Sequence, residues 1–201
     1  MSHSERYLSF RCPRWRELPE LELYMDQVLC ILEKNLGLFG EETDGKKEDD
    51  GQKTSVVITP TMINNYVKNK LIPPPEKKRY SRLHLAYLHI ICVGKRILSM
   101  SEIKAVLDIL LDEYTPEEAY DLFCDEIEGA LRHTFGGEFL SAGDGSLSSA
   151  RIVLSALANA FSFKMYAQNT ISEVRPAVTE ENSKQKEKNK EKEKNKKNSE
   201  K

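Results

Sequence analysis

Three consecutive prolines, Pro73–Pro75, constrain the fold of this 201-residue chain more than any other feature. Proline has no backbone N–H and disfavours helical geometry in the residue before it, so no helix can run through this point. The preceding segment, residues 59–72, reads as a short helix, because Thr59 can cap its N-terminus and Pro60 fits its first turn. Its apolar side chains recur at helical spacing and are predicted to face inward: Met62, Ile63, Tyr66 and Val67.

Charge is strongly segregated along the chain, although the formal net charge is only −2. Residues 17–52 hold eleven acids against three bases, and residues 108–128 hold nine acids and no base. Between them, residues 60–104 hold nine bases against two acids. A basic region inside an acidic protein is a candidate polyanion site, because neutralised phosphates release counterions. The alternative is a basic surface that balances the acidic helices of the same fold.

Apolar periodicity and helix-capping signals predict further helices on both sides of the prolines. Their expected ranges are 17–36, 83–97, 99–114, 115 to just before Gly136, and 147–168. Residues 54–58 read either as a short β-prone entry or as an extended lead into the helix that begins at Thr59. The last helix is rich in small residues and either completes the core or meets a second subunit. The fold class is therefore all-α, a multi-helix domain with at most a small β-wing at 73–82.

The same pattern divides the chain into regions. They are an N-terminal arm at 1–16, a region at 17–111 with an acidic loop at 37–53, a C-terminal helical region at 112–172 and a charged tail at 173–201. The C-terminal helical region is a candidate for effector binding or dimerisation. The tail is expected to be disordered, because it cannot bury enough apolar surface to offset the entropy of ordering.

Several classes of function find no support in the sequence. The four cysteines are widely spaced, which argues against zinc, and Cys30, Cys92 and Cys124 are predicted to be core residues. His84 and His89 are expected at surface or packing positions, and the acidic helix at 116–131 is expected to present a solvated face. No catalytic constellation is visible, so we expect no enzyme, no catalytic residue, no metal and no cofactor. With neither a signal peptide nor a membrane span in sight, a cytoplasmic protein is expected.

Short motifs stand on both sides of the prolines in an order that is known from a family of regulators. Tyr66, Leu71-Ile72, Pro73 and Lys78-Arg79-Tyr80 stand at spacings that resemble the MerR family of transcriptional regulators. The resemblance covers residues 59–107. It matches the family pattern best in its last segment, Ser99–Leu107. It implies a winged helix-turn-helix, with 59–72 as the recognition helix and 73–82 as the wing.

The segment also departs from the MerR pattern. Asn64 and Asn65 stand where the family has Arg and Tyr, and Lys70 stands where it has Gly. Asn69 is expected to take the left-handed turn instead of that glycine. The whole chain is also similar to a bacterial family known as domain of unknown function 1836, which implies a bacterial origin and a regulatory role.

A DNA-binding surface is the interpretation that unites these features. Asn side chains can pair with an adenine edge in the major groove, and cations hold the phosphates. The candidate DNA-binding residues are Thr61, Asn64, Asn65, Lys68, Lys70, Lys77, Lys78, Arg79, Tyr80 and Arg82, with Tyr80 as the apolar anchor of the wing. The blander alternative is an exposed polar helix followed by a solvated basic turn.

The function expected from these residues is sequence-specific transcriptional regulation. The partner is double-stranded DNA, the protein is a repressor or a repressor-like switch, and it acts as a homodimer with 147–168 as the candidate contact. The alternative is a helical protein–protein interaction adaptor that does not bind DNA.

Overall fold

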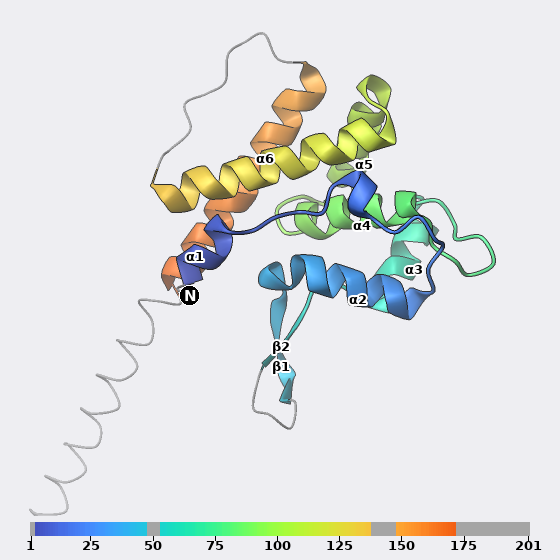
Figure 1. Ribbon diagram of the computed structural model, residues 1–201, viewed down its shortest axis with the longest axis horizontal. Helices are drawn as coiled ribbons and strands as arrows, with labels where there is room; N and C mark the ends of the chain where they lie inside the picture. Colours follow the sequence, from blue (N-terminus) through green and yellow to red (C-terminus); the bar gives the residue numbers. More distant parts are fainter. Residues whose placement is uncertain (1–2, 48–52, 138–147, 172–201) are drawn as a thin grey trace, which may run out of the picture. The chain divides into compact units, whose positions relative to one another are not determined.

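The computed structural model describes residues 3–47, 53–137 and 148–171 (Figure 1). Apart from one antiparallel hairpin the described fold is all-α. Its elements are α1 (His3–Leu8), η1 (Trp15–Glu17), α2 (Met25–Leu36), η2 (Gly37–Phe39), β1 (Glu41–Lys47), β2 (Lys53–Val56), α3 (Pro60–Lys68), α4 (Arg82–Gly94), α5 (Met100–Glu113), α6 (Pro116–Gly136) and a helix at 149–171. The predicted tail at 173–201 lies outside the described residues.

Contacts divide the chain into two units, Met1–Phe163 and Lys164–Lys201. The first unit holds every element except the end of the helix at 149–171. None of the described helices combines the length and the apolar character that crossing a lipid bilayer requires.

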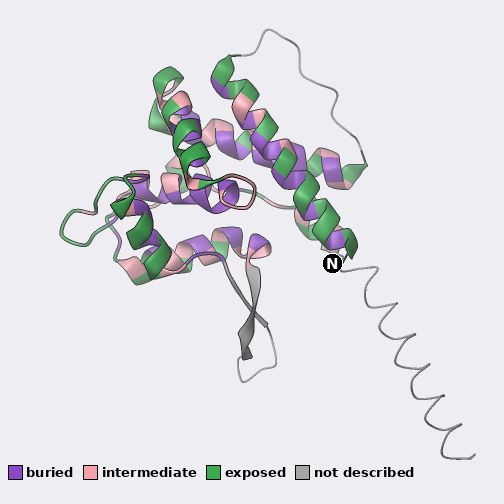
Figure 2. Ribbon diagram, turned by 180° about the vertical axis from the view of Figure 1, so that it is seen from behind, coloured by how far each residue is buried: buried purple, intermediate pink, exposed green. Residues whose placement is uncertain are grey.

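Helix α4 is the centre of the first unit. Ten of its 13 residues are buried, so it is apolar almost all round and must be covered on every side (Figure 2). Helices α2 and α6 pack against it, and α5 approaches its C-terminal end, where a Cβ on Gly94 would lie 3.3 Å from the Ile103 side chain. The glycine therefore permits a close crossing of α4 and α5.

His89 lies in the middle of α4 and is completely buried. Its Nδ1 is 2.8 Å from the Leu85 carbonyl oxygen, and its Nε2 is 3.1 Å from Nδ2 of Asn35 on α2. A neutral ring with the proton on Nδ1 satisfies both contacts, since it donates to the carbonyl and accepts from the amide. Burial lowers the pKa of His89 to about 4. The packing alternative is therefore confirmed for this residue.

The helix ends follow local capping chemistry, as the sequence predicts. Thr59 caps α3, with its Oγ1 accepting from the Met62 N–H at 3.3 Å. Ser99 with Glu102 forms a capping box at the start of α5, and Thr115 with Glu118 forms another at the start of α6. Helix α6 ends at Gly137, whose φ of 83° is left-handed and suits a residue without a Cβ.

The predicted helix at 17–36 is wrong in its first eight residues. The helix begins at Met25, and Leu21 is 80% exposed rather than part of an apolar stripe. Leu23 instead exchanges two backbone hydrogen bonds with Tyr80, of 2.9 and 2.8 Å. A residue inside a helix could not make this antiparallel bridge, so the contact with Tyr80 keeps the chain extended up to Tyr24.

Other expectations need smaller corrections. Cys30 is exposed, whereas Cys92 and Cys124 are buried as predicted. Met62 is 39% exposed rather than inward-facing. The predicted loop at 37–53 contains η2 and β1, and its residues 48–52 lie outside the described part of the chain.

The N-terminal segment lies along α6 and is held by charge. Buried Glu128 accepts from the Cys12 N–H at 2.9 Å and pairs with Arg14 at 3.1 Å. The Trp15 N–H donates to Asp121 at 2.7 Å. The prediction of a wholly solvated acidic face on α6 is therefore wrong at Glu128, because an N–H group and a guanidinium from the N-terminal segment replace water around its carboxylate.

An aromatic cluster joins the N-terminal segment to the last helix. The Tyr7 ring stacks on Phe135 of α6, with ring centroids 4.2 Å apart. Phe39 contacts Phe10 at 4.6 Å and Phe161 at 4.9 Å. The part of this helix that belongs to the first unit, residues 149–163, therefore completes the core on one side, while Ile152 on another side is 51% exposed.

Acid should destabilise this protein through His89. Because the pKa is about 4 in the folded chain and about 6.5 in the unfolded chain, the unfolded state takes up the proton first as the pH falls. The stabilisation is complete above pH 6.5 and disappears on going down to pH 4. The expected loss in the free energy of unfolding is about 3 kcal/mol.

Urea unfolding followed by circular dichroism between pH 7.5 and 4 measures this loss. His89→Gln should be less stable at pH 7 but should depend less on pH over that interval. Leu88→Ala, at another fully buried position of α4, is the control: it removes no titratable group and should be less stable at pH 7 but keep the slope of the parent. An unchanged slope in His89→Gln would contradict the assignment.

Candidate nucleic-acid interface

Helix α3 has one buried and one exposed face. Ile63 and Tyr66 are buried, at 0% and 6% exposure, and burial raises the pKa of the Tyr66 hydroxyl to about 12. The predicted contact residues of this helix lie on the other face, where all are exposed: Thr61, Asn64, Asn65 and Lys68. The buried pair fixes the rotation of the helix about its axis, so the opposite face of α3 is exposed (Figure 2).

Helix α3 ends in a left-handed residue, and that residue is Lys70. Its φ is 56°, whereas Asn69 has φ −86°, so the expectation that Asn69 takes the left-handed turn is wrong. The Leu71 N–H donates to the Tyr66 carbonyl at 2.9 Å, and the Lys70 N–H donates to Val67 at 3.0 Å. This is the Schellman arrangement, which places the left-handed residue one position after the cap.

The basic turn, residues 76–79, follows the prolines. Glu76 and Arg79 form an isolated antiparallel bridge, and the Arg79 N–H donates to the Glu76 carbonyl at 2.8 Å. The two central residues, Lys77 and Lys78, have φ of 47° and 64°, as a type I′ turn requires. Turns of this type usually hold Asn or Gly there, so two exposed lysines are kept in a sparsely populated conformation.

The segment before α2 anchors the basic turn. Tyr80 is 3% exposed and is bridged to Leu23. The Arg79 guanidinium lies over the Tyr24 ring, 4.9 Å from its centroid, and donates to the Tyr24 hydroxyl at 3.1 Å. Tyr80 is thus the apolar anchor that the sequence predicts. Tyr24 was missed, because nothing local connects it with a turn 55 residues later.

Arg82 differs from the other cations of the candidate site. Its side chain is only 18% exposed, lies 3.1 Å from the Glu20 carboxylate and has its guanidinium 5.8 Å from the centre of the Trp15 ring. A guanidinium held between a carboxylate and an indole is less available to phosphate than the exposed lysines. The structure therefore brings eight of the ten predicted residues to α3, its C-terminal end and the basic turn. Tyr80 is buried directly after the turn, and Arg82 is set apart at the start of α4.

His84 ties the prolines to α4. Its Nε2 is 3.2 Å from the Pro73 carbonyl oxygen, and its Nδ1 accepts from the Ser81 N–H at 3.0 Å. Burial lowers the pKa of His84, so the neutral ring that these contacts need is favoured. The first of the three prolines is consequently held against α4.

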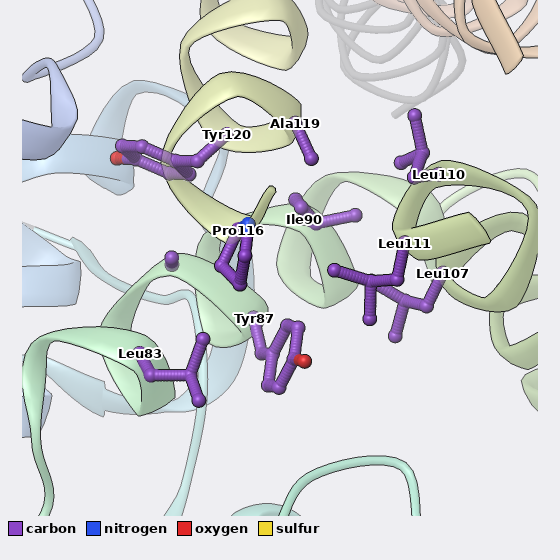
Figure 3. A pocket seen from close by; sticks show the side chains of 10 residues that line it. Leu83, Tyr87, Ile90, Leu107, Leu110, Leu111, Pro116, Ala119 and Tyr120 are labelled. Atoms are coloured by element: carbon purple, nitrogen blue, oxygen red, sulfur yellow. The ribbon is translucent and has the colours of Figure 1, made fainter. Parts of the chain in front are cut away.

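Two hollows lie near this surface. The smaller, between α4, α5 and α6, is lined by apolar groups such as Leu83, Tyr87 and Leu110 and has a volume of about 10 Å³ (Figure 3). It has room for about one water molecule and offers no polar partner, so it is a packing gap. The larger is a groove of about 270 Å³ between the end of α3, the prolines, α4 and α5.

Within the described ranges, no three His, Cys, Asp or Glu side chains are grouped to hold a metal ion.

Comparison with known protein families gives one match. The family described as Domain of unknown function (DUF1836) matches residues 13–123. The chain belongs to this family. In this DUF1836 protein the matched range begins in the segment that lies on α6 and ends at Phe123 within α6, so it contains α3, the basic turn and α4. No curated protein and no solved structure matches the chain, and the similarity to MerR-type regulators stays an expectation.

The left-handed lysine at the end of α3 predicts an unusual response to glycine. Lys70→Gly should raise the free energy of unfolding by about 0.5–1 kcal/mol, because glycine adopts positive φ without the penalty of a Cβ. The matched control is Lys68→Gly, inside α3, which should lower it by about 1 kcal/mol. Urea unfolding of both variants measures the difference, and a loss of stability in Lys70→Gly would contradict the assigned backbone conformation.

Proposed function

We propose that this protein is a sequence-specific DNA-binding transcriptional regulator with a winged helix-turn-helix, of the type seen in MerR regulators. Helix α3 would lie in the major groove and the basic turn would act as the wing on the adjacent backbone. The observation that carries the proposal is the pairing of an exposed Asn64/Asn65/Lys68 face with an exposed Lys77-Lys78 turn, each anchored from behind by a buried tyrosine.

The chemistry of the two parts is complementary. An exposed Asn amide can form two hydrogen bonds with the edge of one adenine. Each such bidentate contact discriminates against a wrong base by about 1–3 kcal/mol. Lysines and arginine that contact phosphate carry little sequence information but fix the register. The left-handed Lys70 supports the proposal further, because it stands where the MerR pattern has glycine.

The proposed mode of action is that of a dimeric repressor. A single α3 would read only a few base pairs, so two copies on a two-fold operator are needed for specificity. The helix at 149–171 is the candidate contact, since its Ile152 and Phe163 are exposed, at 51% and 42%.

The second candidate function is a protein-interaction adaptor, which the acidic groove of about 530 Å³ along α6, lined by Glu117, Asp121 and Asp125, would favour.

The wing is tested by removing its charge. Lys77/Lys78/Arg79→Ala should weaken binding to promoter DNA of the protein's own gene and to unrelated DNA alike. The slope of log K against log salt should become shallower by about 2–3, since each phosphate contact contributes about 0.9. The control, Arg11/Arg16/Lys34→Ala, removes the same charge from exposed positions outside the site and should change binding little.

The reading helix is tested separately. Asn64/Asn65→Ala should reduce the preference for the operator over unrelated DNA by about 10–100-fold while leaving the salt slope unchanged. If the triple wing variant binds DNA as tightly as the parent at low salt, the proposal fails. A stoichiometric protein partner, with no shift of any genomic fragment, would favour the adaptor.

A further inference from the structure

The groove between α3, the prolines, α4 and α5 has the chemistry of a small-molecule site. One part of its wall is apolar: Leu71 and Ile72 come from the end of the α3 segment, and Leu107 from α5, and all three are buried. Tyr87 of α4 also lines it, and burial raises the pKa of its hydroxyl, which therefore stays a neutral hydrogen-bond donor. The volume of about 270 Å³ is just below the usual lower limit of about 300 Å³ for ligand pockets, so a ligand must be small.

Charge at the groove is unbalanced. Lys70 and Lys104 line it together with one acid, Asp108. Lys70 has no ion-pair partner among the described residues, and its ammonium is carried on a backbone held at φ 56°. One positive charge is therefore left over beside an apolar wall.

The ion pair between Lys104, the second lysine, and Asp108 is weak. Lys104 donates to Asp108 at 2.8 and 3.1 Å, but the two side chains are 49% and 59% exposed and the lysine comes first in the i,i+4 pair. Exposed pairs in this order contribute little to stability. A ligand carboxylate could therefore take over part of the hydrogen bonding of Lys104 at small cost.

We infer that this groove binds a small amphipathic monocarboxylate, with its carboxylate between Lys70 and Lys104 and its aromatic or branched apolar part against Leu71, Ile72 and Leu107. A monoanion neutralises the excess charge, and the apolar wall excludes ligands that are charged throughout. The volume favours a single-ring or branched-chain acid over a long-chain fatty acid. Binding itself does not depend on the proposed DNA function.

The site also gives a consequence that rests on the proposed function. Val67 and Lys70 line the groove. Val67 lies in the last turn of α3, and Lys70 lies two residues beyond its end. A ligand that contacts them restrains the end of the proposed reading helix and draws Lys70 away from DNA. Protein with a ligand in the groove should then bind DNA more weakly than ligand-free protein. The number of ligand molecules bound per chain should stay the same.

Calorimetric titration of the full chain with phenylacetate, at low salt and without DNA, tests the inference. We expect saturable binding of one phenylacetate per chain, with phenylacetamide at least tenfold weaker because it lacks the charge. Lys70→Gln and Lys104→Gln should each weaken phenylacetate binding by about tenfold. The control Lys34→Gln removes one exposed charge on α2, outside the groove, and should leave the affinity unchanged.

A gain of affinity provides the sharpest test, because a misfolded variant cannot produce it. Asp108→Asn removes the competing carboxylate and should strengthen phenylacetate binding several-fold. The inference is overturned if phenylacetate does not saturate, if phenylacetamide binds equally well, or if the two groove lysines prove no more important than Lys34. DNA binding is measured separately, so loss of the ligand site and loss of the DNA function are distinguishable.

Discussion

The burial of α4 on almost all sides is the constraint on which the rest of the first unit depends. A helix without a solvent face forms only if neighbours cover it, and α2, α5 and α6 do so. The neighbouring helices must also provide hydrogen-bond partners for His89. One ring nitrogen bonds to the Leu85 carbonyl on its own helix, and the other bonds to Asn35 on α2. The hydrogen bonds thus fix how α2 sits on α4, and hydrophobic burial supplies the stability.

The candidate DNA-binding surface is built outward from that helix. His84 reaches back from α4 to Pro73, and Tyr80, two residues before α4 begins, is bridged to Leu23. The basic turn therefore has both ends attached to the packed core although its lysines are exposed. Two left-handed lysines at its tip cost conformational energy, and such strain persists only where the surroundings enforce it. The anchoring explains how a polar, basic segment can be held in one shape.

Much of this was predictable because it is local chemistry. The capping residues, the prolines and the apolar spacing gave α3, α4, α5 and α6 within a few residues, since caps and periodicity act over one or two turns. The errors fall where partners are distant in sequence. Leu23 was predicted to be helical, but its pairing with Tyr80 keeps it extended. Glu128 was predicted to be solvated, but the N-terminal segment packs against it. Periodicity carries no information about such partners.

By itself, then, the sequence determined that the chain is helical, where its helices are capped, that Pro73–Pro75 ends one of them, and that the cations gather around that stop. Only the tertiary structure decided that Lys70 rather than Asn69 turns left-handed, that Arg82 is engaged with Glu20 and Trp15, and that two lysines border an apolar groove. The physical reason is distance along the chain. Capping and helix termination are settled by neighbours within a few residues, whereas the exposure and pairing of a charge depend on which remote surface packs beside it.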